Sequence, residues 1–289
     1  MGRNAVILVD KGEGITSFDC LGRIKHNVNK KTGHCGTLDR FAHGLIVVLC
    51  GTYTHMVPAF MGLDKTYEAT IEFGRMTDTL DPEGEVLETG EIPDLETIKM
   101  AVEKLTGDIM QMPPLYSAIH VNGKRSYQMA RSGQEVELTP RPIKIYKAEI
   151  LSWEAPFLKI RLEVSKGTYI RSYARDLGHE CGSCAYVKEL YRTKIGPFSI
   201  DEAIRFDDIE AMQNLADSES LISRLPGFIR MEVDDTEAFK AKNGYVLPSI
   251  RKRIPEGTRF AMLLNQGKAV CIYAPQERKI LCQMGVDNG

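Results

Sequence analysis

Alternating apolar and polar positions mark several stretches of the chain as strands. Between Tyr67 and Phe73 every second side chain is apolar or aromatic, and Leu158–Val164 alternates even more regularly. A period of two places such side chains on one face of a half-buried strand. Two further runs, Ala5–Val9 and Leu45–Cys50, are continuously apolar, and the second is short and rich in β-branched residues. Both are predicted to be strands, the second of them buried.

Two stretches have the periodicity and the end signals of helices. Thr16 or Ser17 can cap a helix that covers about residues 18–28. A second helix begins at Pro93-Asp94 and ends near Gly107, a residue typical of helix C-termini. Its apolar stripe consists of Ile98, Ala101, Val102 and Leu105.

The hydrophobic pattern changes towards the C-terminal end of the chain. After Phe198 come an acidic region of helical character and a junction, Arg224–Gly227. From about residue 231 onward, short apolar runs alternate with turns that contain Gly or Pro. These predicted strands are Arg259–Leu264, Ala269–Tyr273 and Lys279–Met284. We therefore expect a large domain over residues 1–230 and a small one over residues 231–289.

The composition is that of an ordinary globular protein. Of the 289 residues, 43% are hydrophobic and 26% are charged. No apolar run approaches the roughly 18 residues that a membrane span needs, and the first residues lack the pattern of a signal peptide. The seven cysteines, an odd number, fit a reducing compartment. We therefore expect a cytoplasmic protein that does not associate with membranes.

Sequence motifs for metals and nucleotides are missing. Cys181 and Cys184 have the spacing of a zinc knuckle, but no second Cys or His pair follows at the interval of a metal site. The loop with Gly12 and Gly14 lacks the pattern of a phosphate-binding P-loop. We therefore expect neither a cofactor nor a metal.

Charge is segregated along the chain. The net charge is −2, yet six Lys or Arg and only two acidic residues lie between His120 and Lys147. Acidic residues gather later, between Asp207 and Glu237. Such segregation can leave a basic face for RNA phosphates, but a solvated loop gives the same counts. The charge pattern leaves both interpretations open.

The segment Gly33–Gly44 is the best candidate for chemistry. It combines three glycines, two histidines and a single carboxylate, Asp39, and it leads directly into the predicted strand Leu45–Cys50. Glycines let the backbone approach a ligand closely, and an aspartate on a loop fixed by a buried strand is well placed to act on a bound molecule. An ordinary turn closed by an Asx hydrogen bond would use the same residue types.

The same segment carries a family resemblance. Gly33, His34, Gly36, Leu38, Asp39, Ala42 and Gly44 match the signature Gly-His-x-Gly-x-Leu-Asp-Pro-x-Ala-x-Gly of the TruB family of pseudouridine synthases. Further matching motifs follow in the same order, over roughly the first 200 residues. They are Lys65–Ala69, Phe73-Gly74, Thr77–Thr79 with Asp81, Pro113-Pro114, Tyr116–Ala118 and Ser165–Ser172. The chain resembles this family over most of its length.

The resemblance implies both a fold and an activity. The fold would be the α+β pseudouridine synthase fold, with a mixed, mainly antiparallel sheet flanked by helices and a small C-terminal all-β PUA-like barrel that binds RNA. The activity would be isomerisation of uridine to pseudouridine at position 55 in the T-loop of tRNA. We expect tRNA as the partner, a monomer, and no obligatory protein partner. Two alternatives share some of these features: a catalytic subunit of an RNA-guided particle, and a non-catalytic RNA-binding or RNA-folding protein.

Three residues are expected to be catalytic. The resemblance makes Asp39 the carboxylate that acts as a nucleophile, at C1′ or C6 of the uridine, or as a base at the ribose. It makes Tyr67 the ring that stacks on the flipped base, although a tyrosine on a strand face also serves as plain core packing. Arg171, beside a catalytic aspartate, would orient that carboxylate through charge-assisted hydrogen bonds.

A further set of residues is assigned to RNA binding. The set consists of His34, Lys11, Arg40, Lys124, Arg125, Arg131 and Tyr169. The resemblance places His34 against the RNA loop that the flipped base vacates, although a histidine here is also an ordinary hydrogen bonder of a turn or core. The basic segment of about residues 120–145 corresponds to an RNA-gripping insertion, and its interleaved tyrosine agrees with that use.

Three positions depart from the family pattern. Gly12 replaces the proline that usually follows the lysine at position 11, so this turn is less rigid. Arg40 replaces the proline after Asp39, and His43 stands where a small or hydroxyl residue is usual. Arg40 adds a second cation beside Asp39, which can stabilise the ionised carboxylate or bind an RNA phosphate.

Overall fold

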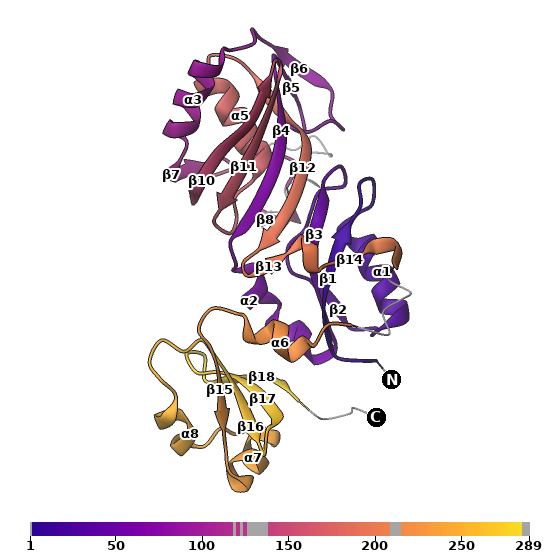
Figure 1. The fold of residues 1–289 in the computed structure, drawn as a ribbon, viewed down its shortest axis with the longest axis vertical. Coiled ribbons are helices and arrows are strands. Elements are labelled where there is room, and N and C mark those ends of the chain that lie inside the picture. Colours follow the sequence, from indigo (N-terminus) through magenta and orange to yellow (C-terminus); the bar gives the residue numbers. More distant parts are fainter. Residues whose placement is uncertain (1, 118–119, 122–123, 126–137, 209–214, 285–289) are drawn as a thin grey trace. The chain divides into compact units, whose positions relative to one another are not determined.

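The computed structural model describes residues 2–117, 120–121, 124–125, 138–208 and 215–284 (Figure 1). It divides the chain into two compact units. The first unit consists of Met1–Leu38, Leu45–Gly62 and Gly196–Gly289, and the second of Asp39–Gly44 and Leu63–Ile195. This division is based on contacts within the fold. The predicted domain boundary near residue 230 stays a prediction.

The second unit is built on an antiparallel sheet. Its strands are β4 (Lys65–Phe73), β7 (Gly107–Gln111), β10 (Arg141–Glu154), β11 (Phe157–Val164) and β12 (Ala185–Ile195). They lie in the order β12-β4-β11-β10-β7, and each neighbouring pair is antiparallel. The apolar face predicted for β4 is buried, with Tyr67, Ala69, Ile71 and Phe73 all inside. The other face is not fully exposed as a half-buried strand would be, because Thr70 and Glu72 are buried as well. Long strands that pair over most of their length give this unit a rigid frame.

Two helices and a short hairpin complete the second unit. The helix α3 (Leu95–Lys104) is capped by Asp94, as predicted, and buries Ile98, Ala101 and Val102. It packs against α5 (Ile170–Glu180) and against β10 (Figure 1). The strands β5 (Arg75–Thr77) and β6 (Val86–Thr89) form the hairpin. Arg171 lies in the first turn of α5.

The first unit contains a second group of strands around β1 (Ala5–Lys11). The strands β14 (Ile204–Arg205), β1 and β3 (His43–Cys50) lie in that order, and β14 is parallel to β1. The short strand β2 (Thr32–His34) pairs with β3 in antiparallel orientation. Parallel and antiparallel pairs together give the mixed sheet that the sequence led us to expect. The small elements are η1 (Gly51–Met56), α2 (Val57–Met61), β13 (Phe198–Ser199), η2 (Ile200–Glu202) and α6 (Ser218–Ser223).

The helix α1 (Ser17–Asn27) also belongs to the first unit and begins where the sequence predicts. Thr16 accepts a hydrogen bond from the main-chain N–H of Asp19, and the Asp19 carboxylate accepts one from the main-chain N–H of Thr16. This reciprocal arrangement satisfies two donors that a helix N-terminus otherwise leaves unpaired. Cys20, Leu21 and Ile24 form the buried face of the helix.

The C-terminal part of the first unit is a four-stranded sheet with two helices. The strands are β15 (Phe228–Glu232), β16 (Phe260–Asn265), β17 (Lys268–Ala274) and β18 (Lys279–Gln283), in that order. The last three confirm the predicted strands. The prediction of an all-β barrel needs correction, because the described residues form an open four-stranded sheet. The same region also contains two helices, α7 (Asp235–Lys242) and α8 (Pro248–Arg253). Both helices are short, so their apolar residues form too little of a stripe to be recognised from the sequence.

The predicted insertion at about residues 120–145 is described only in part. The strands β8 (His120–Val121) and β9 (Lys124–Arg125) pair with each other. Residues 126–137 lie outside the described residues, and β10 begins at Arg141 and joins the main sheet. No helix in the described part of the chain is long and apolar enough to cross a membrane.

Candidate active site

The loop Asp39–Gly44 is fixed to the sheet of the second unit at its C-terminal end. His43 and Gly44, the first residues of β3, pair with Tyr191 and Arg192 of β12. The rings of His43 and Tyr191 stack with their centroids 4.5 Å apart. Gly44 has a φ of 111°, and a Cβ atom here would lie 2.4 Å from the main-chain oxygen of Arg192. Only glycine fits this position, so the glycine of the motif allows the loop to reach the sheet.

Arg171 approaches Asp39 from the first turn of α5. Its Nε lies 2.9 Å from Oδ2 of Asp39, a close ionic contact whose N–H is not aimed at the oxygen. The directed hydrogen bond between the two residues runs from Nη2 to Oδ1, at 3.4 Å. The side chain of Arg171 is 6% exposed, whereas that of Asp39 is 39% exposed. The pair therefore consists of a buried cation and a carboxylate that solvent or substrate can reach.

A second carboxylate, Asp81, contacts the other end of the same guanidinium. Nη1 of Arg171 donates to Oδ2 of Asp81 at 3.2 Å. The Oδ1 atom accepts from the Thr79 hydroxyl at 2.6 Å and from the main-chain N–H of Glu83 at 3.0 Å. Burial is the largest influence and raises the pKa of Asp81 above its ordinary value, while Thr79, Arg171 and the Glu83 amide act in the opposite direction. These donors hold Asp81 in one orientation.

Main-chain carbonyl groups complete the environment of Arg171. Nη1 donates to the oxygen of Thr79 at 2.8 Å, and Nη2 donates to the oxygen of Tyr116 at 2.9 Å. The guanidinium therefore contacts two carboxylates and two carbonyls, which use most of its planar set of donors. Since a buried guanidinium with this many partners has little freedom to turn, its face towards Asp39 is fixed before any substrate binds.

Tyr67 lies in register with the end of the Asp39 loop. In β4 it pairs with Arg192, and Arg192 pairs with Gly44 on the other side of β12. Neighbouring strands are about 4.8 Å apart, which places Tyr67 roughly 10 Å across the sheet from Gly44. Its side chain is 8% exposed. The expected stacking on a base therefore has to use one part of a ring that is otherwise packed in the sheet.

The residues predicted to bind RNA lie in several different elements of the fold. Tyr169 is the N-cap of α5 and is half-buried, and burial raises the pKa of its hydroxyl. Arg40 is exposed beside Asp39. His34 is half-buried in β2, which belongs to the first unit. Lys124 and Arg125 are the residues of β9, and Arg131 lies outside the described residues.

Lys11 is buried in this structure, and the expectation that it binds RNA stays a prediction. Its side chain is fully buried in the first unit, and its ammonium donates to the carbonyl oxygens of Gly12 at 2.9 Å and of Ile15 at 2.8 Å. These two contacts hold the ammonium group inside the turn. Lys11 instead closes the turn that follows β1, where Gly12 stands in place of the usual proline.

Sequence reasoning did not assign a role to Asp81 or Thr79. A signal was present, because both residues belong to the motif quoted for the family resemblance. A pattern rich in Thr and Asp is also typical of ordinary turns, and only the contact with Arg171 separates Asp81 from the neighbouring Asp78. That contact joins residues 90 positions apart, so sequence spacing does not reveal it.

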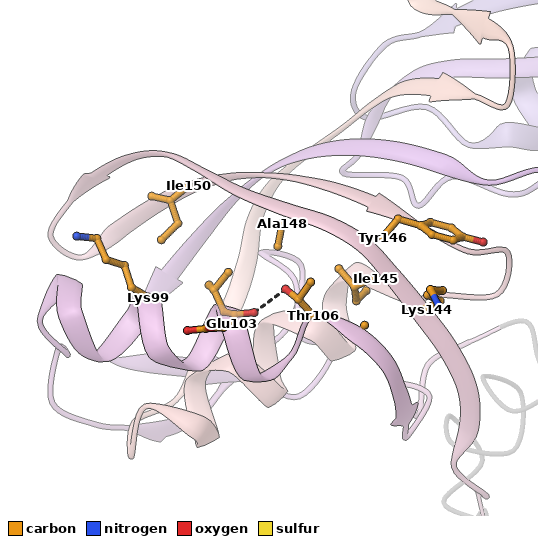
Figure 2. A pocket seen from close by; sticks show the side chains of 10 residues that line it. Lys99, Glu103, Thr106, Lys144, Ile145, Tyr146, Ala148 and Ile150 are labelled. Carbon is orange, nitrogen blue, oxygen red and sulfur yellow. Dashed lines mark hydrogen bonds between the residues drawn. The ribbon is translucent and has the colours of Figure 1, made fainter.

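A pocket elsewhere in the second unit is separate from these residues. It has a volume of about 620 Å³ and lies between α3 and β10 (Figure 2). Its lining includes Lys99, Glu103, Lys144 and Tyr146, and none of the candidate catalytic residues. The reactive groups are therefore found at the Asp39 loop and not in this pocket.

Two solved structures have a fold similar to that of this chain. The chain of a crystal structure of a Cbf5-Nop10-Gar1 complex matches with a TM-score of 0.68 and 24% identity, over 98% of this chain and 84% of that one. A chain in a structure of an H/ACA RNP bound to a substrate RNA containing 2′-deoxyuridine matches with a TM-score of 0.67 and 21% identity. The match covers 98% of this chain and 84% of that one. At this identity the likeness shows the fold alone, and the fold is that of the pseudouridine synthases.

Sequence comparisons narrow the class. Residues 24–170 match the model described as TruB family pseudouridylate synthase (N terminal domain), and residues 171–230 match the tRNA pseudouridylate synthase B C-terminal domain. The tRNA pseudouridine synthase B of Borreliella afzelii is 41% identical over 247 residues, 83% of this chain and 85% of that protein. The protein of the same name from Bacillus licheniformis is 36% identical over 294 residues, which cover 96% of this chain and 94% of that protein. The chain belongs to the TruB family of pseudouridylate synthases.

Proposed function

We propose that this protein isomerises uridine to pseudouridine in tRNA, at position 55 of the T-loop. Its relatives at 36–41% identity carry the name tRNA pseudouridine synthase B, and they are matched over most of their length. The observation that carries the proposal for this chain is the set of contacts around Arg171. A half-exposed carboxylate, Asp39, is held by a buried guanidinium that a second carboxylate, Asp81, anchors from behind.

The reaction needs no external donor or oxidant. The bond between N1 of uracil and C1′ of the ribose breaks, the uracil turns, and a new bond forms between C5 and C1′. C5 then loses its proton and N1 gains one, so the product is an isomer of the substrate. The protein has to supply a carboxylate, a surface that holds the detached base, and a way to reach a nucleotide inside folded RNA.

Asp39 is the carboxylate in this proposal. It acts as the nucleophile, which requires the ionised form and a fixed direction of approach. Arg171 lies within 2.9 Å of Oδ2, and it stabilises the negative charge without covering the exposed part of Asp39. Arg171 is oriented in turn by Asp81 and by the carbonyls of Thr79 and Tyr116. Such preorganised charge is effective because it does not have to rearrange during the reaction.

Tyr67 holds the flipped base in this proposal. It lies in a central strand, in register with the end of the Asp39 loop, so its position relative to Asp39 is set by paired backbone. Base stacking on an aromatic ring tolerates rotation of the base in its plane, which the reaction requires. Tyr169 and Arg40 are proposed to contact the RNA around the flipped nucleotide.

RNA affinity is proposed to come from regions outside the Asp39 loop. The basic segment with Lys124, Arg125 and Arg131 and the C-terminal module of residues 231–289 would bind phosphates of the tRNA. His34 is proposed to contact the RNA loop that the base leaves. The proposal also includes action as a monomer without an obligatory protein partner, in the cytoplasm.

The two alternatives are less well supported. The structural likeness to chains from RNA-guided particles stays at 21–24% identity and concerns the fold. A non-catalytic RNA-binding protein would have no need for a carboxylate held by a buried arginine. In this chain Asp39, Arg171 and Tyr67 are all present, and two of them are in direct contact.

One assay separates the proposal from both alternatives. Purified protein is incubated with an unmodified tRNA transcript, and pseudouridine is mapped by nucleotide position. The proposal predicts pseudouridine at position 55, and none in a matched transcript in which cytidine replaces that uridine. Modification that appears only after a guide RNA is added would support the RNA-guided alternative. Tight binding without product would support the non-catalytic one.

A further inference from the structure

Gln111 makes a pair of hydrogen bonds to the residue that begins α5. It is the last residue of β7 and is 2% exposed. Its Nε2 donates to the main-chain oxygen of Tyr169 at 3.1 Å, and its Oε1 accepts from the main-chain N–H of Tyr169 at 2.9 Å. One side-chain amide therefore binds both main-chain groups of the same residue, much as a neighbouring strand would.

The main chain of Tyr169 determines where α5 begins. It is the N-cap of α5, and its own side chain does not cap the helix. Its carbonyl oxygen also accepts the first hydrogen bond inside the helix, from Tyr173. Since Arg171 follows only two residues later, any shift of the Tyr169 backbone moves the position from which the guanidinium reaches Asp39.

The segment after Gln111 adds further contacts to the same turn. The Ser172 hydroxyl and Nη2 of Arg175 both donate to the carbonyl oxygen of Met112, at 2.8 Å and 2.9 Å. Nη2 of Arg171 donates to the oxygen of Tyr116. Residues 111–116 therefore hold the start of α5 at several points, and Gln111 is the member that binds it through a buried side chain.

We propose that Gln111 is a positioning residue for the isomerisation: it fixes the N-cap of α5 and thereby the direction from which Arg171 holds Asp39. The inference rests on the proposed function, because it concerns the same carboxylate. At 2% exposure Gln111 does not reach the RNA, so it acts on the rate of the chemical step and not on affinity. A misplacement of about 1 Å in a reacting group can lower a rate about 10²-fold.

Two substitutions separate this role from simple packing. Gln111→Met keeps the length of the side chain but removes both hydrogen bonds. Gln111→Glu keeps the shape and makes the contact depend on pH. A protonated carboxyl group can donate to the Tyr169 oxygen and accept from its N–H, whereas an ionised one can only accept and repels that oxygen. Burial raises the pKa of the introduced carboxyl group, so both forms are accessible in the assay.

The control is the loss of a buried hydrogen bond in which no residue of α5 takes part. Tyr186→Phe removes the bond from the Tyr186 hydroxyl to Glu72, 2.7 Å long, between β12 and β4 of the same unit. This variant should lose stability to a similar degree but keep the wild-type rate. Each variant is assayed at saturating enzyme in single-turnover reactions with unmodified tRNA, and its thermal unfolding and tRNA affinity are measured in parallel.

The inference predicts a specific pattern of results. Gln111→Met should react roughly 10- to 100-fold more slowly than wild type with tRNA affinity within a few-fold. The rate of Gln111→Glu relative to wild type should rise as the pH is lowered from about 8 to about 5.5, as its carboxyl group becomes protonated. If Gln111→Met is not folded, the pH profile of the Glu variant decides alone.

Other results would overturn the inference in distinguishable ways. If wild type is active but the Gln111 variants match the rate of Tyr186→Phe, Gln111 has no positioning role. The same conclusion follows if the variants lose affinity instead of rate, or if the relative rate of Gln111→Glu does not change with pH. If wild type itself forms no pseudouridine, the proposed function fails, and the inference fails with it.

Discussion

Two loops of the second unit each present an aspartate to Arg171, and they do so in different ways. The loop Asp39–Gly44 holds its carboxylate at the surface, where 39% of the side chain is exposed. The turn that contains Asp81 holds its carboxylate inside, with 6% of the side chain exposed. The buried carboxylate also accepts hydrogen bonds from Thr79 and Glu83, in addition to the contact with Arg171. The same residue type therefore has two roles, and burial separates them.

The difference explains why one guanidinium serves both loops. A buried charge is costly unless it is paired and hydrogen-bonded, and Asp81 with its donors meets that requirement for Arg171. Because Asp81 compensates the buried positive charge of Arg171, Asp39 is not needed for that purpose. The charge and hydrogen bonds of Asp39 can therefore change during the reaction. We therefore propose Asp81 as the residue that anchors Arg171 and Asp39 as the residue that reacts.

The substitution Asp39→Asn should have the largest effect on this comparison. The amide keeps the shape of the side chain but loses charge and nucleophilicity, so single-turnover rates should fall by roughly 10⁴-fold or more, the scale seen when a nucleophile is removed. tRNA affinity should stay within a few-fold. Product formed by the asparagine protein, after mass spectrometry has verified the substitution, would rule out Asp39 as the nucleophile.

Arg171→Lys should have the next largest effect. An ammonium cannot reproduce the planar set of donors that reaches Asp39, Asp81 and two carbonyls together. We expect a loss of roughly 10²-fold in the single-turnover rate, with a smaller change in binding. Stopped reactions at saturating enzyme measure the rate, and filter binding measures the affinity. Wild-type kinetics in the lysine variant would contradict any role of Arg171 in orienting Asp39.

Asp81→Asn should have an intermediate effect. The asparagine amide can accept hydrogen bonds on one side only, so either Arg171 or the donors Thr79 and Glu83 lose a partner. A hydrogen bond to a charged group is worth roughly 1.5 kcal/mol, which corresponds to about a 10-fold lower rate. Asp78→Asn in the same turn is the matched control, because Asp78 bonds the main chain of Glu85 and not Arg171. Equal losses in both variants would assign the effect to the turn as a whole.

The smallest effect on chemistry should come from the basic segment. Replacing Lys124, Arg125 and Arg131 by neutral residues should weaken tRNA binding. The dependence of log K on log salt should flatten by somewhat under one unit for each phosphate that the protein no longer binds. The single-turnover rate at saturating enzyme should stay near that of wild type. An unchanged salt slope would mean that the charges between His120 and Lys147 belong to a solvated loop that does not bind RNA.

The sequence predicted several strands correctly, among them β4 and β11, while the chemistry of the Asp39 loop stays a prediction. The sequence signals were apolar alternation in β4 and β11, a capping residue before α1, and a family signature around Asp39. The arginine partner could be named only because a family resemblance connected Ser165–Ser172 with Asp39, 132 residues earlier. Contacts over such a separation depend on the fold, which local patterns do not encode.

Other features were beyond the reach of sequence patterns for physical reasons. The burial of Lys11 contradicts the usual preference of lysine for the surface, and its main-chain partners appear only once the turn after β1 is formed. The helices α7 and α8 are too short for a clear periodicity. Gln111 looks like an ordinary polar residue until β7 and α5 bring it next to Tyr169.

The central claim is that Asp81 acts on the reaction through Arg171 and that Arg171 acts on Asp39. The most direct test is a double-mutant cycle in single-turnover rates on one tRNA, with wild type, Asp81→Asn, Arg171→Lys and the double variant. Residues that act through one contact give losses that do not multiply. The account predicts that the double variant reacts about as slowly as Arg171→Lys alone. Losses that multiply in the double variant would show that Asp81 and Arg171 act independently, and would contradict the account.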